Sequence, residues 1–213
     1  KNHVQVRRYL KDVEPQSATS DYAIFRARFP VVERFFNALE RHVPHGAWLF
    51  DDNIIFAQNF FRVAGGNRYF PNSGVSSLGH AIPAAIGARF AAQSTERRSS
   101  WAIVGDGGFQ MCCMELMTAV NYGIPLNVVL FNNATLGLIR KNQTQQYDGR
   151  FIDCDFVNPD YAALAQSFGI RYRHVADEGD IEALFAQDDV YGAINLIEIP
   201  LDKDAFPNYL SKR

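Results

Sequence analysis

The stretch WAIVGDGG, residues 101–108, joins an apolar run to a glycine-rich turn that carries one carboxylate, Asp106. An apolar run followed by a turn and a helical pattern is typical of a buried strand in a parallel sheet. A glycine-rich turn in this place commonly offers backbone N–H groups to a phosphate. The charge of Asp106 would repel a phosphate that approached alone, so the turn predicts a divalent cation between the two groups.

A second polar turn follows the next apolar run. The stretch NVVLFNNAT, residues 127–135, places Asn132 and Asn133 after a run typical of a central parallel strand. Asp106 and Asn133 are 27 positions apart (133 − 106), the length of a turn, a helix and a strand. Neighbouring parallel strands end at one edge of the sheet, so both side chains can converge on Mg²⁺, which prefers oxygen ligands.

Strand-like and helical runs alternate along the chain, which predicts a doubly wound α/β domain with a mostly parallel sheet and helices on both faces. The expected strands are 47–50, 101–104, 126–131, 170–175 and 193–199, and the expected helices are 31–43, 78–92, 111–122 and 158–169, the last capped by Asn158 or Asp160. Residues 1–20 are polar and are expected to be a linker or arm from a preceding domain. Residues 21–200 then form the domain, and residues 201–213 a C-terminal tail.

Composition narrows the class of partner. The chain has 213 residues, 47% of them hydrophobic, and a net charge of −2, with no basic stripe. This disfavours nucleic acid or an anionic membrane as a partner and favours a small molecule. No apolar run is long enough for a membrane span or a signal peptide, so a cytoplasmic location is expected. The three cysteines, Cys112, Cys113 and Cys154, lack disulfide or metal spacing and are interpreted as reduced thiols.

GDG followed by NN at this spacing resembles the signature of thiamine-diphosphate (ThDP) enzymes. The resemblance extends from about residue 51 to about residue 199. It includes GVSSLGHAIPAAIGARFA at 74–91, GDGGFQMCCMELMTAV at 105–120 and NPDYAALAQSFG at 158–169. The chain looks like the C-terminal, diphosphate-binding (PP) domain of the pyruvate oxidase, acetolactate synthase and 2-oxoacid decarboxylase group, which implies the ThDP-binding fold.

The resemblance implies a set of site residues. The side chains of Asp106 and Asn133 and the backbone carbonyl of Thr135 match the family's Mg²⁺ ligands. Leu78 falls where the family has the apolar residue that bends the cofactor into a V. The implied cofactor contacts are Ser76, Leu78, Gly105, Asp106, Gly107, Gly108, Asn133, Thr135, Leu136, Gly137 and, on a looser local match, Asn53.

Other polar residues are weaker candidates for the site. Glu115 matches a family glutamate whose role is mostly structural. His80 is either a cofactor neighbour or an ordinary helix-start histidine. Arg140 and Lys141 either meet a substrate carboxylate or form a solvated cationic face.

The resemblance implies a ThDP- and Mg²⁺-dependent enzyme that decarboxylates a 2-oxoacid, ligates the resulting carbanion to a carbonyl acceptor, or both. The family's catalytic glutamate lies on a separate pyrimidine-binding (PYR) domain, and no glutamate of this chain has that context. We therefore expect no catalytic residue here and a PYR domain of the same or another subunit as partner, in a homodimer or homotetramer.

Three alternatives stay open. They are an oxidase or lyase of the same superfamily, a non-catalytic assembly or regulatory module that keeps the fold, and a nicotinamide dehydrogenase. The last is disfavoured because Gln110 stands where the third glycine of GxGxxG would fall.

Overall fold

Six parallel strands form one sheet in the computed structural model, which describes residues 20–42, 46–63, 66–92, 99–186 and 189–206. The order of the strands in the sheet is β2-β1-β3-β4-β6-β5, and every neighbouring pair is parallel. The strands are β1 (Ala47–Asp51), β2 (Arg68–Pro71), β3 (Ser99–Gly105), β4 (Leu126–Asn132), β5 (Arg171–His174) and β6 (Ile194–Pro200). The predicted doubly wound α/β fold is confirmed.

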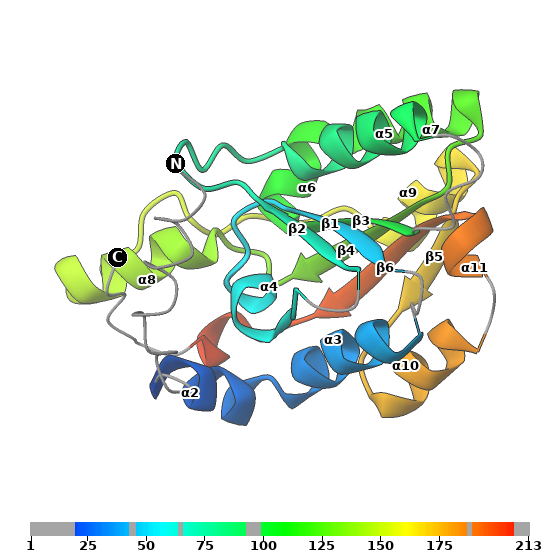
Figure 1. Ribbon diagram of the computed structural model, residues 1–213. Helices are drawn as coiled ribbons and strands as arrows, with labels where there is room; N and C mark the ends of the chain where they lie inside the picture. The colour runs from blue at the N-terminus through cyan, green and yellow to red at the C-terminus, as the bar shows by residue number, and fades with distance from the viewer. Residues whose placement is uncertain (1–19, 43–45, 64–65, 93–98, 187–188, 207–213) are drawn as a thin grey trace, which may run out of the picture.

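Helices cover both faces of the sheet, with α5, α7 and α9 on one side and α3 and α10 on the other (Figure 1). The α-helices are α2 (Ser20–Arg28), α3 (Pro30–His42), α4 (Ile55–Phe60), α5 (Ala81–Ala91), α6 (Asp106–Cys112), α7 (Leu116–Tyr122), α8 (Gly137–Gln146), α9 (Tyr161–Phe168), α10 (Glu178–Phe185) and α11 (Asp189–Gly192). Two short 3₁₀ helices, η1 (Cys113–Glu115) and η2 (Lys203–Ala205), complete the described elements.

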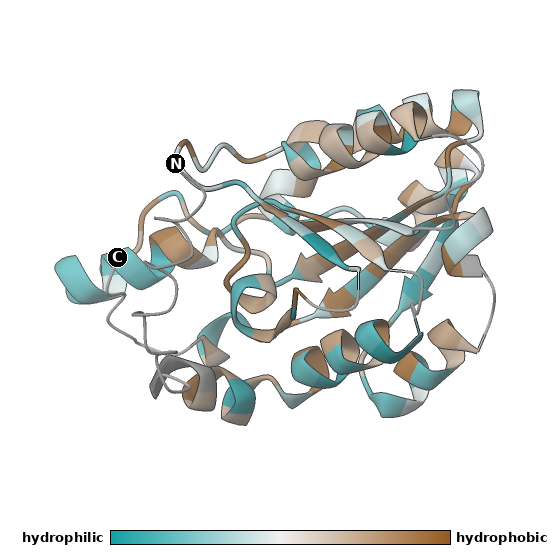
Figure 2. Cartoon of the chain, in the orientation of Figure 1, coloured by the Kyte–Doolittle hydropathy of each residue, from teal (hydrophilic) through white to brown (hydrophobic). Residues whose placement is uncertain are grey.

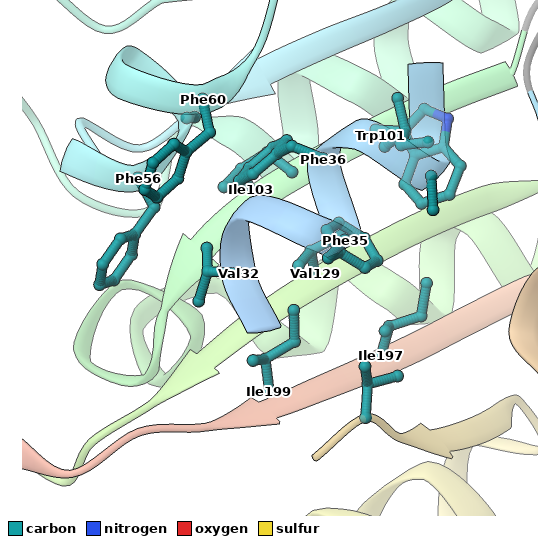
Figure 3. Close-up of a cluster of buried hydrophobic side chains, with 14 of the residues drawn as sticks. Val32, Phe35, Phe36, Phe56, Phe60, Trp101, Ile103, Val129, Ile197 and Ile199 are labelled. Carbon is teal, nitrogen blue, oxygen red and sulfur yellow. The ribbon is translucent and has the colours of Figure 1, made fainter. Parts of the chain in front are cut away.

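The central strands are apolar on both sides because both faces are covered. Along β3, Trp101 and Ile103 belong to the cluster under α3, whereas Ala102 and Val104 belong to the cluster under α5. Figure 3 shows the first cluster, where Phe35 and other aromatic side chains of the helices meet the strand residues. In Figure 2 the central strands β4 and β6 are largely hydrophobic, whereas α3 carries many hydrophilic residues. The sheet is therefore a rigid base for the turns at its carboxyl edge.

The five predicted strands are present, and a sixth, β2, was not predicted. β2 pairs only with β1 at the edge of the sheet, and three of its four residues are exposed. An edge strand of this kind has no apolar run, so its sequence carries no strand signal.

The predicted helix 111–122 is interrupted. Helix α6 begins earlier, at Asp106, and a 3₁₀ turn separates it from α7. The end of α7 is as expected, because Gly123 takes the left-handed conformation, with φ 60°, that stops a helix. The helix predicted at 158–169 begins with Asp160 as its cap, whose carboxylate accepts the N–H of Ala163.

The expected linker and C-terminal tail can be compared with the structure only in part. The expected linker at 1–20 lies outside the described residues except for Ser20, which opens α2. The described start of the expected tail packs on the domain, because the ring of Phe206 lies 5.6 Å from that of Phe25.

Among the described helices, none is long and apolar enough to cross a membrane.

Candidate functional site

Three turns, which follow β1, β3 and β4, meet the loop before α5 at the carboxyl edge of the sheet. A Cβ placed on Gly108 would lie 2.5 Å from Oδ2 of Asp52 and 3.7 Å from the backbone N of Gly79. A Cβ placed on Gly107 would lie 2.6 Å from Cδ2 of Leu136. The structure thus brings together the segments that the sequence predicted as one site.

Asp106 lies at the centre of this site and is buried, with 1% of the residue exposed. Its Oδ2 accepts hydrogen bonds from the backbone N of Asn133 at 3.0 Å and of Ala134 at 2.5 Å, and from Nδ2 of Asn158 at 2.8 Å. Its Oδ1 accepts from the N–H of Gly107 at 3.0 Å. One carboxylate therefore holds the turn after β4 against the turn after β3.

Burial raises the pKa of Asp106 above its ordinary value, even though four hydrogen bonds, from Asn158 first, act in the opposite direction. A carboxylate removed from water is costly to keep ionised unless a cation lies beside it. A divalent ion at this position would restore the ionised form.

The turn after β4 carries the other predicted ligands. Ala134 has a φ of 53°, a conformation that is uncommon for residues other than glycine. Asn133 Oδ1 lies 3.3 Å from the N of Thr135, and Thr135 forms an antiparallel bridge with Asp155. The turn is thus fixed from both sides, by Asp106 at the backbone of Asn133 and Ala134 and by Asp155 at Thr135.

Glycine is required on steric grounds at the start of α6. Any side chain at Gly108 would meet the carboxylate of Asp52, and any side chain at Gly107 would meet Leu136. Gly105 is the N-cap residue of α6, and a Cβ at Gly137 would lie 3.3 Å from Nδ2 of Asn133. Glycine at positions 107 and 108 therefore lets the start of α6 pack directly against Leu136 and Asp52.

Asp52 was not predicted as a site residue, yet it positions the loop before α5. Its Oδ2 accepts the N–H of Gly79 at 2.6 Å, and its Oδ1 accepts those of His80 at 2.9 Å and Ala81 at 3.1 Å. Asp52 is fully buried and caps the first turn of α5 from the end of β1. These contacts hold the loop beside α6.

The loop before α5 contains the two candidates Ser76 and Leu78. Ser76 has a φ of 54° and is exposed, whereas Leu78 is partly buried. Asn53, after β1, also has a positive φ, 64°, and its Oδ1 accepts a hydrogen bond from Gln58. Strained residues thus occur in three of the turns at this edge, which is common at ligand sites.

The remaining polar candidates are either exposed to solvent or already paired with other side chains. His80 and Glu115 are both exposed. Arg140, in α8, forms ion pairs with Asp155 at 3.0 Å and Asp204 at 2.7 Å, and its guanidinium stacks on Phe151. Arg140 borders a pocket of about 180 Å³, which Gly137 and Lys141 also line. The pocket begins where the turn after β4 ends.

Asn158 is the second residue that sequence reasoning missed. It was considered only as a helix cap, but its side chain reaches Asp106, 52 positions away. No local pattern marks such a contact. The sequence signal for Asn158 was limited to its place as a polar residue shortly before α9.

The donor set at Asp106 fits a hard divalent cation. Among the described residues, no group of three or more His, Cys, Asp or Glu side chains could hold a metal. A site here would instead combine one carboxylate, one amide oxygen, one backbone carbonyl and oxygens of a ligand. Such all-oxygen sets are typical of Mg²⁺ bound together with a diphosphate.

Comparison with protein families gives one match that covers most of the domain. Residues 52–193 match the family described as "Thiamine pyrophosphate enzyme, C-terminal TPP binding domain". The matched segment contains the turns after β3 and β4 and the loop before α5.

Several acetolactate synthases are similar to this chain. The acetolactate synthase of Mycobacterium bovis is 38% identical over 120 residues, which is 54% of this chain and 19% of that protein. The probable acetolactate synthase large subunit of Methanococcus aeolicus is 34% identical over 134 residues, 62% of this chain and 22% of that protein. The matched part thus spans about a fifth of the length of these relatives.

Two solved structures share the fold. The thiamine diphosphate-dependent 4-hydroxybenzoylformate decarboxylase of Rhodococcus jostii RHA1 superposes with a TM-score of 0.71 at 24% identity, over 84% of this chain and 33% of that one. The benzoylformate decarboxylase of Polynucleobacter necessarius gives a TM-score of 0.70 at 19% identity, over 81% of this chain and 32% of that one.

Proposed function

Because the chain belongs to the thiamine pyrophosphate enzymes, as their C-terminal TPP-binding domain, we propose that it is the Mg²⁺- and diphosphate-binding half of a ThDP-dependent decarboxylase or carboligase. The similarity to acetolactate synthases supports a 2-oxoacid as the substrate. The observation that carries the proposal is the buried carboxylate of Asp106, which joins the turns after β3 and β4 at the carboxyl edge of the sheet.

The residues have distinct roles in this proposal. Asp106, the amide oxygen of Asn133 and the carbonyl of Thr135 would hold the Mg²⁺, and the backbone at Gly107 and Gly108 would bind the diphosphate. When bound, ThDP supplies a thiazolium ring that accepts the electron pair released as a 2-oxoacid loses CO₂. The chain itself contributes binding, orientation and electrostatics.

The loop before α5 is the second part of the proposed cofactor site. Ser76 and Leu78 offer backbone contacts and an apolar side chain, and Asp52 keeps their loop in place. Asn53, Gly105, Leu136 and Gly137 complete the proposed contacts from the three turns.

A PYR domain, in the same or another subunit, is the proposed partner. Among the described residues, Glu198 is the one buried glutamate, and Asn132 and Tyr172 already donate hydrogen bonds to its two oxygens. It is therefore not available to activate a cofactor ring, which supports a partner domain as the source of the catalytic glutamate. Exposed apolar side chains on α5 and α6, such as Phe90 and Met111, are suited to contact a partner in a homodimer or homotetramer.

Binding measurements on the 213-residue chain test the proposal. Isothermal titration calorimetry should detect ThDP binding in Mg²⁺ and none in EDTA. Asp106→Ala and the shape-matched Asp106→Asn should abolish the Mg²⁺-dependent binding while circular dichroism shows the fold retained. Absence of binding to the wild-type chain in Mg²⁺ would favour a non-catalytic module, and NADH binding that survives EDTA would favour a dehydrogenase.

Turnover provides a second test. The chain alone should not convert a 2-oxoacid in the presence of ThDP and Mg²⁺, because half of the site is missing. Turnover by the purified chain without a partner would contradict the half-site.

A further inference from the structure

Asn158 connects the carboxylate of Asp106 to the end of the neighbouring strand. Its Nδ2 donates to Asp106 Oδ2 at 2.8 Å and to Asn132 Oδ1 at 2.7 Å. Its Oδ1 accepts from Nε2 of Gln110 at 2.6 Å. An ionised carboxylate only accepts hydrogen bonds, so the NH₂ group of Asn158 must point toward Asp106 and its amide oxygen toward Gln110.

A chain of hydrogen bonds fixes Asn132 in turn. Nδ2 of Asn132 donates to Glu198 Oε1 at 2.6 Å, and the hydroxyl of Tyr172 donates to Glu198 Oε2 at 2.6 Å. Because the glutamate oxygens are acceptors, the amide of Asn132 can present only its oxygen to Asn158. The orientation of Asn158 is therefore determined by residues of β4, β5 and β6.

The hydrogen bonds of Asp106 are divided unequally between its two oxygens. Oδ2 accepts from Asn133 N, Ala134 N and Asn158 Nδ2, whereas Oδ1 accepts from the adjacent N–H of Gly107. With three donors, both lone pairs of Oδ2 are already in use. Oδ1 keeps a lone pair that can point at a cation.

We propose that Asn158 is a positioning residue, which turns the Asp106 carboxylate so that Oδ2 faces the 133–134 turn and Oδ1 is presented to a divalent cation. This inference rests on the function proposed above for Asp106. Residues that orient metal ligands through a second layer of hydrogen bonds typically change metal affinity by about 10–100-fold when they are replaced.

The first experiment needs no metal. In Asn158→Ala, amide hydrogen exchange measured by NMR should become about tenfold faster at Asn133 and Ala134, whose N–H groups share Oδ2 with Asn158. Exchange in the middle of β4, at Val128, should not change. Unchanged exchange at Asn133 and Ala134 would overturn the proposal.

The second experiment measures metal affinity. Mn²⁺ binding to the full chain in the presence of ThDP, followed by electron paramagnetic resonance, should weaken by about 10–100-fold in Asn158→Ala. Unchanged Mn²⁺ affinity would also overturn the positioning role. If Mn²⁺ and ThDP do not bind to the wild-type chain, the proposed function fails, and the exchange measurement alone decides whether Asn158 orients Asp106.

Two further variants separate positioning from general stability. Asn59→Ala is the matched control, because it removes an amide hydrogen bond of 2.8 Å within α4 and should leave Mn²⁺ affinity unchanged. If Asn158→Ala does not fold, Asn158→Ser replaces it, since a serine hydroxyl is too short to bridge Asp106 and Asn132. A loss of Mn²⁺ affinity in Asn59→Ala equal to that in the Asn158 variant would overturn the assignment.

Discussion

Oδ2 of Asp52 lies 2.6 Å from the backbone N of Gly79, so the end of β1 holds the loop that precedes α5. The same carboxylate accepts two more N–H groups, from the first residues at the start of α5. Carboxylates at helix N-termini are stabilising because several N–H groups there have no partner within the helix. Asp52 supplies this cap from a different part of the chain.

Asp52→Ala should lower the free energy of unfolding by about 3 kcal/mol, because it leaves three N–H groups without their acceptor. Urea denaturation measures the change. Asp177→Ala is the control, since Asp177 caps α10 by accepting one hydrogen bond, from the N–H of Asp180, and its loss should cost about 1 kcal/mol. Equal losses for the two variants would contradict the role assigned to Asp52.

Gly108→Ala should also destabilise the chain, by about 1–3 kcal/mol, because the new Cβ would lie 2.5 Å from Oδ2 of Asp52, whose carboxylate is held in place by three hydrogen bonds. Gly87→Ala is the matched control in α5. Nothing lies within 4 Å of a Cβ at Gly87, so alanine there should raise stability by about 0.5–1 kcal/mol through its helix propensity. Thermal unfolding of both variants provides the comparison, and a stable Gly108→Ala chain would contradict the steric argument.

Asp51 should make stability depend on pH. Burial raises its pKa from 3.8 to about 6, although Tyr69 donates a hydrogen bond to it. The folded chain thus favours the protonated form, and this stabilisation is present below pH 3.8 and is lost as the pH rises through about 6. Asp51→Asn removes the titration, so the wild type should lose up to about 3 kcal/mol relative to this variant between pH 4 and pH 7.

Urea denaturation of wild type and Asp51→Asn at four pH values in that range measures the difference. The raised pKa of Asp106 is common to both proteins, so its contribution cancels. A difference in unfolding free energy that stays constant with pH would contradict the raised pKa of Asp51.

Arg140 should stabilise the contact of α8 with the C-terminal segment. Hydrogen bonds from Lys203 first, then Thr135, together with the charge of Arg140, hold the pKa of Asp155 below its usual range. Arg140→Lys keeps the charge but loses the fork that reaches both Asp155 and Asp204, and should cost about 1 kcal/mol at low salt and less at high salt. Because the pKa of Asp155 is lowered, this contribution is present at neutral pH and is lost in acid.

Arg34→Lys is the control for Arg140. Arg34 pairs with Glu178 at 2.9 Å, and the side chains of both are more than half exposed, so the substitution should have almost no effect. Urea denaturation at two salt concentrations distinguishes the variants. A salt-independent loss in Arg140→Lys would point to packing on Phe151 instead of the ion pairs.

Local patterns in the sequence predicted much of this fold. Apolar runs such as that of β4 and helix stops such as Gly123 are local signals, because burial on both faces and a left-handed conformation each restrict which residues fit. The spacing of Asp106 and Asn133 also predicted that two turns meet, which the hydrogen bonds to Asp106 confirm. Their binding of Mg²⁺ stays a prediction.

The sequence by itself determined the strand and helix pattern and the pair of polar turns, because these depend on residues close together in the chain. The tertiary structure alone decided the long-range contacts of the site and the sixth strand. The roles of Asp52 and Asn158 depend on partners 27 and 52 positions away, and β2 depends on pairing with β1. Such contacts are determined by the path of the loops and by which donors remain unsatisfied once the sheet has formed, and no local pattern records either.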